Sequence, residues 1–225
     1  NCGTKLASAG GWENQDYAIR LWCAYTGTLL ERMTSPQQHG AGVRALSFHP
    51  SDSTTLISGS NDSSAKLWNL VTGNCEATFW HINGLTSVAF DRSNPTSVIT
   101  SSWDKTIKVW NTVTGRCEAT LRGHDATVSK AVFSPDCTLI ASSGDHTVRF
   151  WSPSKGCSLT MTWDSNYFTS MCFSPGSGQI LASGTRDKCI VLRDVDTGDE
   201  ICCLRGGHSN PVTRLEFTED GNILI

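Results

Sequence analysis

Hydrophobic and polar positions alternate along short segments of this chain, and turn residues separate the segments. Residues 98–121, VITSSWDKTIKVWNTVTGRCEATL, contain three such segments, at 98–100, 106–110 and 117–121. The alternation has the period of two that is typical of β-strands. Residues 102–105 and 114–115 between the segments have the composition of tight turns. The pattern predicts an antiparallel meander here.

The same pattern recurs along the chain with a period close to 42 residues. A tryptophan in a matching strand context marks four of the repeats, and an arginine takes this place in the fifth: Trp22, Trp68, Trp110, Trp151 and Arg193. An aspartate stands six residues before each of them: Asp16, Asp62, Asp104, Asp145 and Asp187. Landmarks that coincide at one period are typical of repeat architectures. The first strands of successive repeats are predicted over 43–48, 85–90, 128–133, 168–173 and 212–217.

A histidine also lies four residues before several of these first strands, in Gly-His pairs at 123–124 and 207–208. With these features the chain resembles the WD-repeat β-propeller family, although Asn or Ser follows most of the tryptophans where the family has Asp. The resemblance implies an all-β fold, a β-propeller of four-stranded antiparallel blades. We expect one domain over 1–225, with blades one to six at about 1–32, 39–79, 81–121, 124–163, 164–204 and 208–225.

Blade one lacks a first strand and blade six is only begun, so we expect a fragment of a seven-bladed ring. The alternative is a smaller ring in which residues 212–217 supply the strand that blade one lacks. In that ring, however, residues 223–225 and residues 6–8 would both be the second strand of the same blade.

Composition narrows the functional class. The formal net charge of −3 argues against a nucleic-acid partner, because proteins that bind nucleic acids normally present a basic face. No apolar run is long enough for a transmembrane helix, and no membrane association is expected. The ten cysteines include no CxxC pair, so structural thiols are expected rather than a metal site or disulfides. Unpaired thiols suit a reducing compartment, which predicts an intracellular protein of the cytoplasm or nucleus. No cofactor is expected.

The resemblance also implies a buried hydrogen-bond network in each blade, formed by a histidine, a hydroxyl, the turn aspartate and the tryptophan. The implied sets are His39–Ser58–Asp62–Trp68, His81–Thr100–Asp104–Trp110 and His124–Ser142–Asp145–Trp151. Histidine, aspartate and serine together also suggest a hydrolytic triad. An active site would not recur every 42 residues, so we interpret the sets as structural and expect no enzymatic activity.

Blade five departs from this pattern at two positions. Asp164 replaces the histidine and Arg193 replaces the tryptophan. Because a lone buried charge is costly, we hypothesise that Asp164 and Asp187 pair with Arg193. The alternative is that these side chains reach solvent at the rim.

The resemblance implies a rigid platform that binds a protein or peptide partner through loops on one face. Large aromatic and arginine side chains dominate binding energy at interfaces. The candidates at exposed loop positions are Trp103, Trp12, Arg44, Tyr167 and Arg186. The function expected is a non-catalytic scaffold or adaptor, acting within a multiprotein complex. The alternative is a regulatory or targeting domain of a larger enzyme whose catalytic part is absent from this chain.

Overall fold

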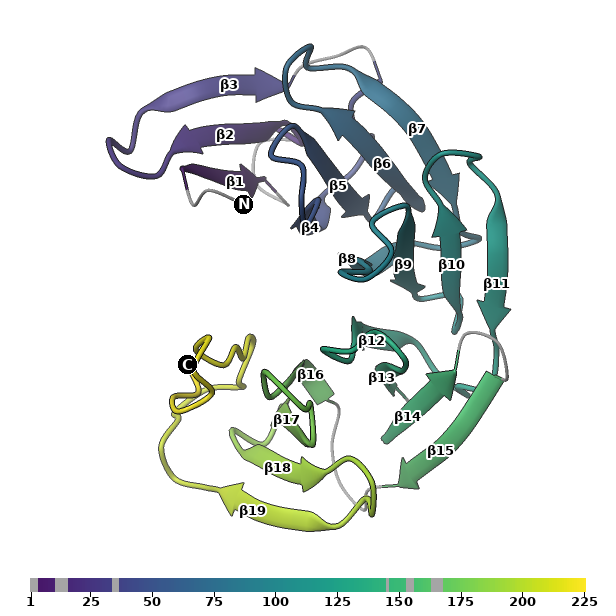
Figure 1. The fold of residues 1–225 in the computed structure, drawn as a ribbon, viewed down its shortest axis with the longest axis vertical. Helices are drawn as coiled ribbons and strands as arrows, with labels where there is room; N and C mark the ends of the chain where they lie inside the picture. Colours follow the sequence, from purple (N-terminus) through teal and green to yellow (C-terminus); the bar gives the residue numbers. More distant parts are fainter. Residues whose placement is uncertain (1–3, 11–15, 34–36, 145, 153–155, 163–167) are drawn as a thin grey trace. The chain divides into compact units, whose positions relative to one another are not determined.

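The computed structural model describes residues 4–10, 16–33, 37–144, 146–152, 156–162 and 168–225. Every regular element among them is a β-strand, and successive strands are neighbours in each sheet. The strands fall into two compact units, Asn1–Thr120 and Leu121–Ile225 (Figure 1). The all-β class that the sequence pattern predicts is confirmed.

Unit 1 contains three sheets, which correspond to the predicted blades one to three. Blade one has three strands, β1 (Lys5–Ala9), β2 (Ile19–Cys23) and β3 (Leu29–Met33). Blade two is formed by β4 (Val43–Phe48), β5 (Thr55–Ser60), β6 (Ser64–Asn69) and β7 (Cys75–Trp80). Blade three is formed by β8 (Leu85–Phe90), β9 (Ser97–Ser102), β10 (Ile107–Asn111) and β11 (Cys117–Leu121). Within this unit the first strands β4 and β8 lie side by side, and β7 and β11 form outer edges (Figure 1).

Unit 2 contains two four-stranded sheets, blades four and five. Blade four is formed by β12 (Val128–Phe133), β13 (Ile140–Gly144), β14 (Thr147–Ser152) and β15 (Gly156–Thr162). Blade five is formed by β16 (Phe168–Phe173), β17 (Ile180–Thr185), β18 (Ile190–Asp194) and β19 (Glu200–Leu204). The predicted first strands of blades two to five have the observed bounds of β4, β8, β12 and β16.

The predicted strand over 212–217 is wrong as a ladder strand. This segment forms only one isolated bridge, between Phe217 and Leu224. Its other backbone groups bond to several partners: Val212 N donates to Thr185 O over 3.2 Å, and Leu215 N donates to the Ser170 hydroxyl over 2.9 Å. A continuous strand needs a neighbour along its whole length, whereas among the described residues only Glu216 and Phe217 of this segment pair with residues 223–225.

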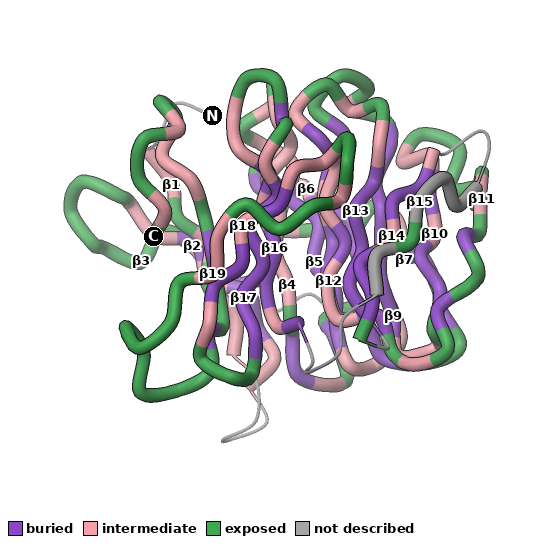
Figure 2. Tube along the Cα trace, turned by 90° about the horizontal axis from the view of Figure 1, so that it is seen from below, coloured by how far each residue is buried: buried purple, intermediate pink, exposed green. Residues whose placement is uncertain are grey.

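The second strand of each four-stranded sheet is buried although its sequence is only weakly hydrophobic. β5, β9, β13 and β17 consist largely of Ser, Gly, Ala and Thr, and almost all of their residues are buried (Figure 2). Small side chains let other segments of the same unit pack closely, as Val88 does against Gly59 and Val212 against Gly184. Hydroxyls at the ends of two of these strands bond to backbone: Ser60 Oγ donates to Ala41 O over 2.9 Å, and Ser102 Oγ donates to Gly84 O over 3.0 Å. These strands therefore anchor the turns at their ends.

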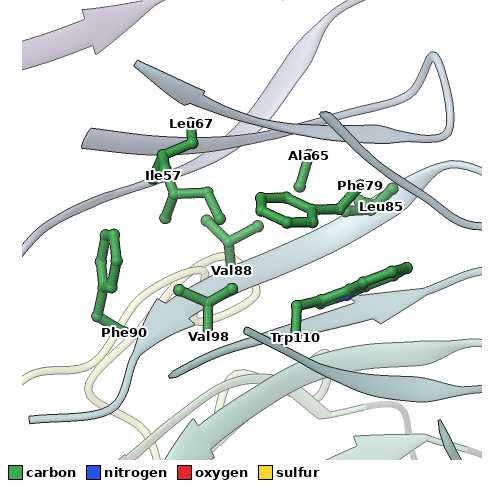
Figure 3. Packing of buried hydrophobic residues seen from close by; sticks show 9 residues of the cluster. All are labelled: Ile57, Ala65, Leu67, Phe79, Leu85, Val88, Phe90, Val98 and Trp110. Carbon is green, nitrogen blue, oxygen red and sulfur yellow. The ribbon is translucent and has the colours of Figure 1, made fainter. Parts of the chain in front are cut away.

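The largest apolar cluster of unit 1 lies between blades two and three. Ile57, Leu85 and Val98 are fully buried there, and Phe79 packs 5.4 Å from Trp110 between ring centroids (Figure 3). Burying each large aliphatic side chain stabilises the fold by about 1.5 to 3 kcal/mol. Blades two and three are thus joined by a continuous core, which holds their loops in fixed positions.

Candidate functional site

The four side chains that the resemblance groups in blade two meet in one hydrogen-bonded chain. His39 Nδ1 donates to Asp62 Oδ2 over 2.8 Å, and its Nε2 lies 2.7 Å from Ser58 Oγ. The Trp68 indole Nε1 donates to the same Ser58 oxygen over 2.7 Å. Ser64 N and Oγ donate to Asp62 Oδ1 over 2.9 and 2.6 Å. The network joins the segment before β4 to β5, β6 and the turn between them.

Blade three repeats this geometry with threonine in place of serine. His81 Nδ1 donates to Asp104 Oδ2 over 2.8 Å, and its Nε2 lies 2.7 Å from Thr100 Oγ1. The Trp110 indole donates to the same hydroxyl over 2.8 Å. Thr106 N and Oγ1 donate to Asp104 Oδ1 over 3.0 and 2.6 Å. A network that satisfies every buried polar group fixes one geometry for the strands that carry it.

The networks lower the pKa of both aspartates, and burial in blade three lowers the pKa of the histidine. Burial opposes ionisation of Asp62 and Asp104, but the hydrogen bonds that each carboxylate accepts outweigh burial and lower the pKa of both groups. Burial lowers the pKa of His81 below its ordinary value of 6.5, although the Asp104 carboxylate works in the opposite direction. Acid therefore disfavours the folded network twice, through His81 and through Asp104.

The order carboxylate, imidazole, hydroxyl matches a hydrolytic triad, but the surroundings of the hydroxyl do not. Ser58 is fully buried, and its oxygen accepts the Trp68 indole N–H while its proton is directed at His39. A nucleophile must reach its substrate, and this oxygen has no solvent-accessible surface. The arrangement can support strand geometry and cannot attack a bound substrate.

In blade four the structure describes three of the four predicted members. His124 Nε2 lies 2.7 Å from Ser142 Oγ, and the Trp151 indole donates to that hydroxyl over 2.7 Å. The serine stands nine residues before the tryptophan, one fewer than in blades two and three, as a shorter turn requires. Asp145 lies outside the described residues.

Blade five replaces the network by a different arrangement. Arg193 lies opposite Leu181 in the ladder and is buried, and its Nη1 donates to Gly198 O over 3.4 Å. Burial lowers the pKa of its guanidinium, which Glu200 partly offsets. Asp187 is exposed, and within the described ranges no ion pair joins it to Arg193. Asp164 lies outside the described residues, so its pairing with Arg193 stays a prediction.

The hydroxyl of Ser183 takes the place in blade five that Ser58 has in blade two. Its oxygen is buried and, within the part of the chain that the structure describes, makes no hydrogen bond. Neither a histidine nor an indole is available at the two positions that serve this hydroxyl in the other blades. Sequence comparison of the repeats places Ser183 in the series, but it does not reveal this loss.

Each first strand carries a β-bulge one residue after its start. The ladder register shifts at the same repeat position in all four complete blades. A bulge removes one residue from the ladder and redirects its side chain. The residues skipped at this position are Arg44, Thr86, Ser129 and Thr169.

Arg44 extends from the blade-two bulge to the β9–β10 turn of blade three. Its guanidinium carbon lies 5.6 Å from the centroid of the Trp103 ring, and its Nε donates to Asn61 Oδ1 over 3.0 Å. Trp103 N donates to Gly84 O over 2.9 Å. A Cβ on Gly84 would lie only 3.1 Å from Trp103 Cε3, so glycine lets the indole lie against the start of β8. We call Arg44, Asn61, Gly84 and Trp103 the Arg44–Trp103 patch.

Two of the five binding candidates, Arg44 and Trp103, are thus in contact. Arg186 is exposed in the β17–β18 turn of unit 2. Trp12 and Tyr167 lie outside the described residues. The candidates do not include Asn61 and Gly84. Asn61 occupies in blade two the turn position that Trp103 occupies in blade three, so alignment of the repeats could have identified it. The role of Gly84 depends on its contact with Trp103, which the repeat period does not reveal.

No group of three or more metal-binding side chains occurs among the described residues, and none of their segments forms a helix able to cross a bilayer. The eight cysteines whose side chains the structure describes are all free thiols.

Comparisons with known proteins agree with the repeat pattern. The model of the family "WD domain, G-beta repeat" matches residues 30–69, 73–111 and 115–152. The chain is 28% identical over 220 residues to "Protein SUPPRESSOR OF PHYA-105 1" of Arabidopsis thaliana, an alignment covering 93% of this chain and 21% of that protein. It is 35% identical over 178 residues to "Nuclear distribution protein nudF" of Emericella nidulans, covering 76% of this chain and 40% of that protein.

A third relative is "Target of rapamycin complex subunit wat1" of Schizosaccharomyces pombe, which is 33% identical over 88 residues, covering 38% of this chain and 27% of that protein. The chain therefore spans less than half the length of each of these relatives. The segments that the family model matches amount to more than half of the chain, and they carry the networks of blades two to four. The chain belongs to the WD-repeat family.

Proposed function

We propose that this chain is a non-catalytic scaffold or adaptor that binds a protein or peptide partner at the Arg44–Trp103 patch. The observation that carries the proposal is the stacking of Arg44 on Trp103 across two blades. Arginine and tryptophan are the residue types most enriched at the energetic centres of interfaces. Here Trp103 is presented by the β9–β10 turn and Arg44 by the bulge of β4, and a buried network and the core between blades two and three hold them in place.

A rigid platform suits this role because binding then orders few side chains. The turn that carries Trp103 is tied down by Asp104, whose carboxylate bonds to the segment before β8. The Arg44 side chain is held between an amide oxygen and an aromatic face. Each side chain that is already ordered saves about 0.5 to 1.5 kcal/mol of binding free energy.

The relatives support protein partners. One of them is named as a subunit of a complex, so association with other proteins is stated for that relative. For this chain we propose a place within a multiprotein complex. The free thiols support a reducing compartment, the cytoplasm or the nucleus.

Affinity capture from cell extract, followed by quantitative mass spectrometry, tests this proposal. The wild-type chain is compared with W103A and with Y25A. Tyr25 is the matched control because it is an exposed aromatic residue in the β2–β3 turn. That turn corresponds to the end of the blade opposite to the β9–β10 turn. The thermal stability of each variant is measured in parallel.

We expect W103A to lose at least one partner that wild type and Y25A recover equally, with the unfolding temperature unchanged. Equal recovery by all three proteins would refute the patch as the binding surface. Loss in Y25A alone would move the site to the opposite turns.

A further inference from the structure

The segment between β7 and β8 contains an asparagine followed by a glycine, Asn83 and Gly84, and this dipeptide occurs once in the sequence. Asparagine is a thermolabile residue because the backbone nitrogen of the next residue can attack its side-chain carbon. A glycine in the next position leaves this approach open, since it has no Cβ and restricts the backbone least. The connection that leads into blade three therefore carries the chemistry of a modification site.

The structure brings the two reacting groups of this dipeptide together. Gly84 N donates to Asn83 Oδ1 over 2.8 Å. Because a C=O bond is about 1.2 Å long, the same nitrogen lies within about 4 Å of Asn83 Cγ. Asn83 is exposed, so water has access to its side chain. Reacting groups that a fold holds close together need little further ordering before they react.

Hydrogen bonds to the β9–β10 turn hold the backbone of the dipeptide in this geometry. Ser102 Oγ shares its proton between Asn83 O and Gly84 O, each at 3.0 Å. Trp103 N donates to Gly84 O over 2.9 Å. The contacts that fix the reactive geometry are thus the same contacts that position Trp103 in the Arg44–Trp103 patch.

We propose that Asn83 is a site of spontaneous modification, and that its modification ends binding at the Arg44–Trp103 patch. Gly84 N gives its proton to a solvent base and forms a bond with Asn83 Cγ, and the side-chain nitrogen leaves as ammonia. Water then opens the resulting succinimide ring at either carbonyl, which leaves aspartate or isoaspartate at this position. The reaction consumes one water and releases one ammonia, and no atom changes its oxidation state.

Either product disturbs the turn that carries Trp103. Aspartate adds a negative charge to the segment that bonds to the Asp104 carboxylate, and like charges at close range repel each other. Isoaspartate adds one carbon atom to the main chain, so the carbonyl groups of Asn83 and Gly84 can no longer both reach Ser102. This consequence rests on the proposed function, whereas the reaction at Asn83 does not.

Peptide mass spectrometry after incubation of the chain in mildly alkaline buffer tests the reaction. Trypsin releases residues 67–92, a peptide that contains Asn69 and Asn74 as internal controls beside Asn83. Fragmentation by electron transfer locates the modified residue and distinguishes isoaspartate from aspartate. Isotope-labelled water marks hydrolysis that occurs during the incubation rather than during digestion.

The matched control is I223G, which gives Asn222 a glycine neighbour and reproduces the sequence Asn-Gly-Leu of residues 83–85 in the same molecule. Ile223 is exposed, and its N–H donates to Thr218 Oγ1 over 3.1 Å rather than to the asparagine side chain. The Asn222 amide donates to Asp220 Oδ2 over 2.9 Å. Asn222 in I223G therefore has the reactive sequence without the reactive geometry.

We expect Asn83 to react in the folded chain at least as fast as in the unfolded peptide 67–92, because no opening step precedes the reaction. A loop that had to open first, even at a cost of about 1.4 kcal/mol, would react about tenfold more slowly. Asn222 in folded I223G should therefore react about tenfold or more slowly than Asn83, and the two rates should become equal in urea. Slower reaction of Asn83 in the folded chain than in the peptide, or equal rates at the two sites in the folded chain, would overturn the inference.

Partner capture by incubated chains tests the consequence. Wild type incubated until Asn83 is converted should lose the partner that W103A loses, whereas N83Q treated in the same way should keep it, because glutamine would have to form a larger ring. Retention of the partner by converted wild type would overturn the proposed loss of binding. If capture does not depend on Trp103 in any chain, the proposed function fails and the loss of binding with it, while the measured reaction at Asn83 stands.

Discussion

Removing the Ser58 hydroxyl tests whether the blade networks hold the fold together. In S58A, His39 Nε2 and Trp68 Nε1 both lose their partner while they remain buried. Each buried polar group left without a partner costs about 1 to 3 kcal/mol, so we expect a loss of about 2 to 6 kcal/mol. This exceeds the effect of most single substitutions.

The matched control is S183A in blade five. Ser183 has the same repeat position and is equally buried, but its hydroxyl makes no hydrogen bond within the described ranges. Removing this hydroxyl breaks no hydrogen bond, and it eliminates a buried polar group that has no partner. We expect the free energy of opening of blade five to be unchanged or to rise by about 1 to 2 kcal/mol.

Native-state hydrogen exchange measures both effects locally, at increasing urea. Peptides that cover β5–β6 and β17–β18 report the opening free energy of blades two and five separately. The reasoning would be refuted if S183A destabilised its blade as much as S58A destabilises its own, because burial of a serine would then matter and its hydrogen bonds would not.

Three further predictions follow from the contacts and charges described above. As pH falls below about 6.5, stability should decline because the unfolded chain binds a proton at His81 more readily than the folded chain does; below about 3.8, Asp104 should add a second decline. Urea midpoints between pH 3 and 8 measure this, and a constant midpoint from pH 7 to 5 would contradict it. N69D should cost about 0.5 to 1 kcal/mol at pH 7, because Asn69 Nδ2 donates to Glu76 over 2.8 Å and a carboxylate there would repel it. The same substitution should be neutral in an E76Q background, and an equal loss in both backgrounds would count against this repulsion. G59A should cost about 1 to 3 kcal/mol by thermal unfolding, because its Cβ would lie 2.7 Å from a valine methyl of β8; no loss would show that the blades can separate.

The repeat period predicted much of the fold because each blade carries its own partners. The family resemblance implied the hydroxyl that joins His39 to Trp68, and the repeat period placed its counterpart in blade three. The bounds of β4 and β8 follow from the same landmarks. The number of blades in the complete ring stays a prediction.

The repeat period could not predict features at positions where the repeats differ in sequence or where two blades are in contact. The contact of Arg44 with Trp103 joins two blades and depends on a bulge, and alternation of polar and apolar residues does not report either feature. The lone hydroxyl of Ser183 depends on what neighbouring positions lack. Segment 212–217 has a strand pattern, but a strand pattern without a paired neighbour does not form a ladder.

The most direct test of the central claim is hydrogen exchange of the chain alone and with its captured partner bound. The account predicts new protection in peptides covering the start of β4 and the β9–β10 turn, which carry Arg44 and Trp103. Peptides covering the β6–β7 and β10–β11 turns at the opposite end should exchange as before. Protection of those opposite turns, with the Trp103 turn unchanged, would contradict the account.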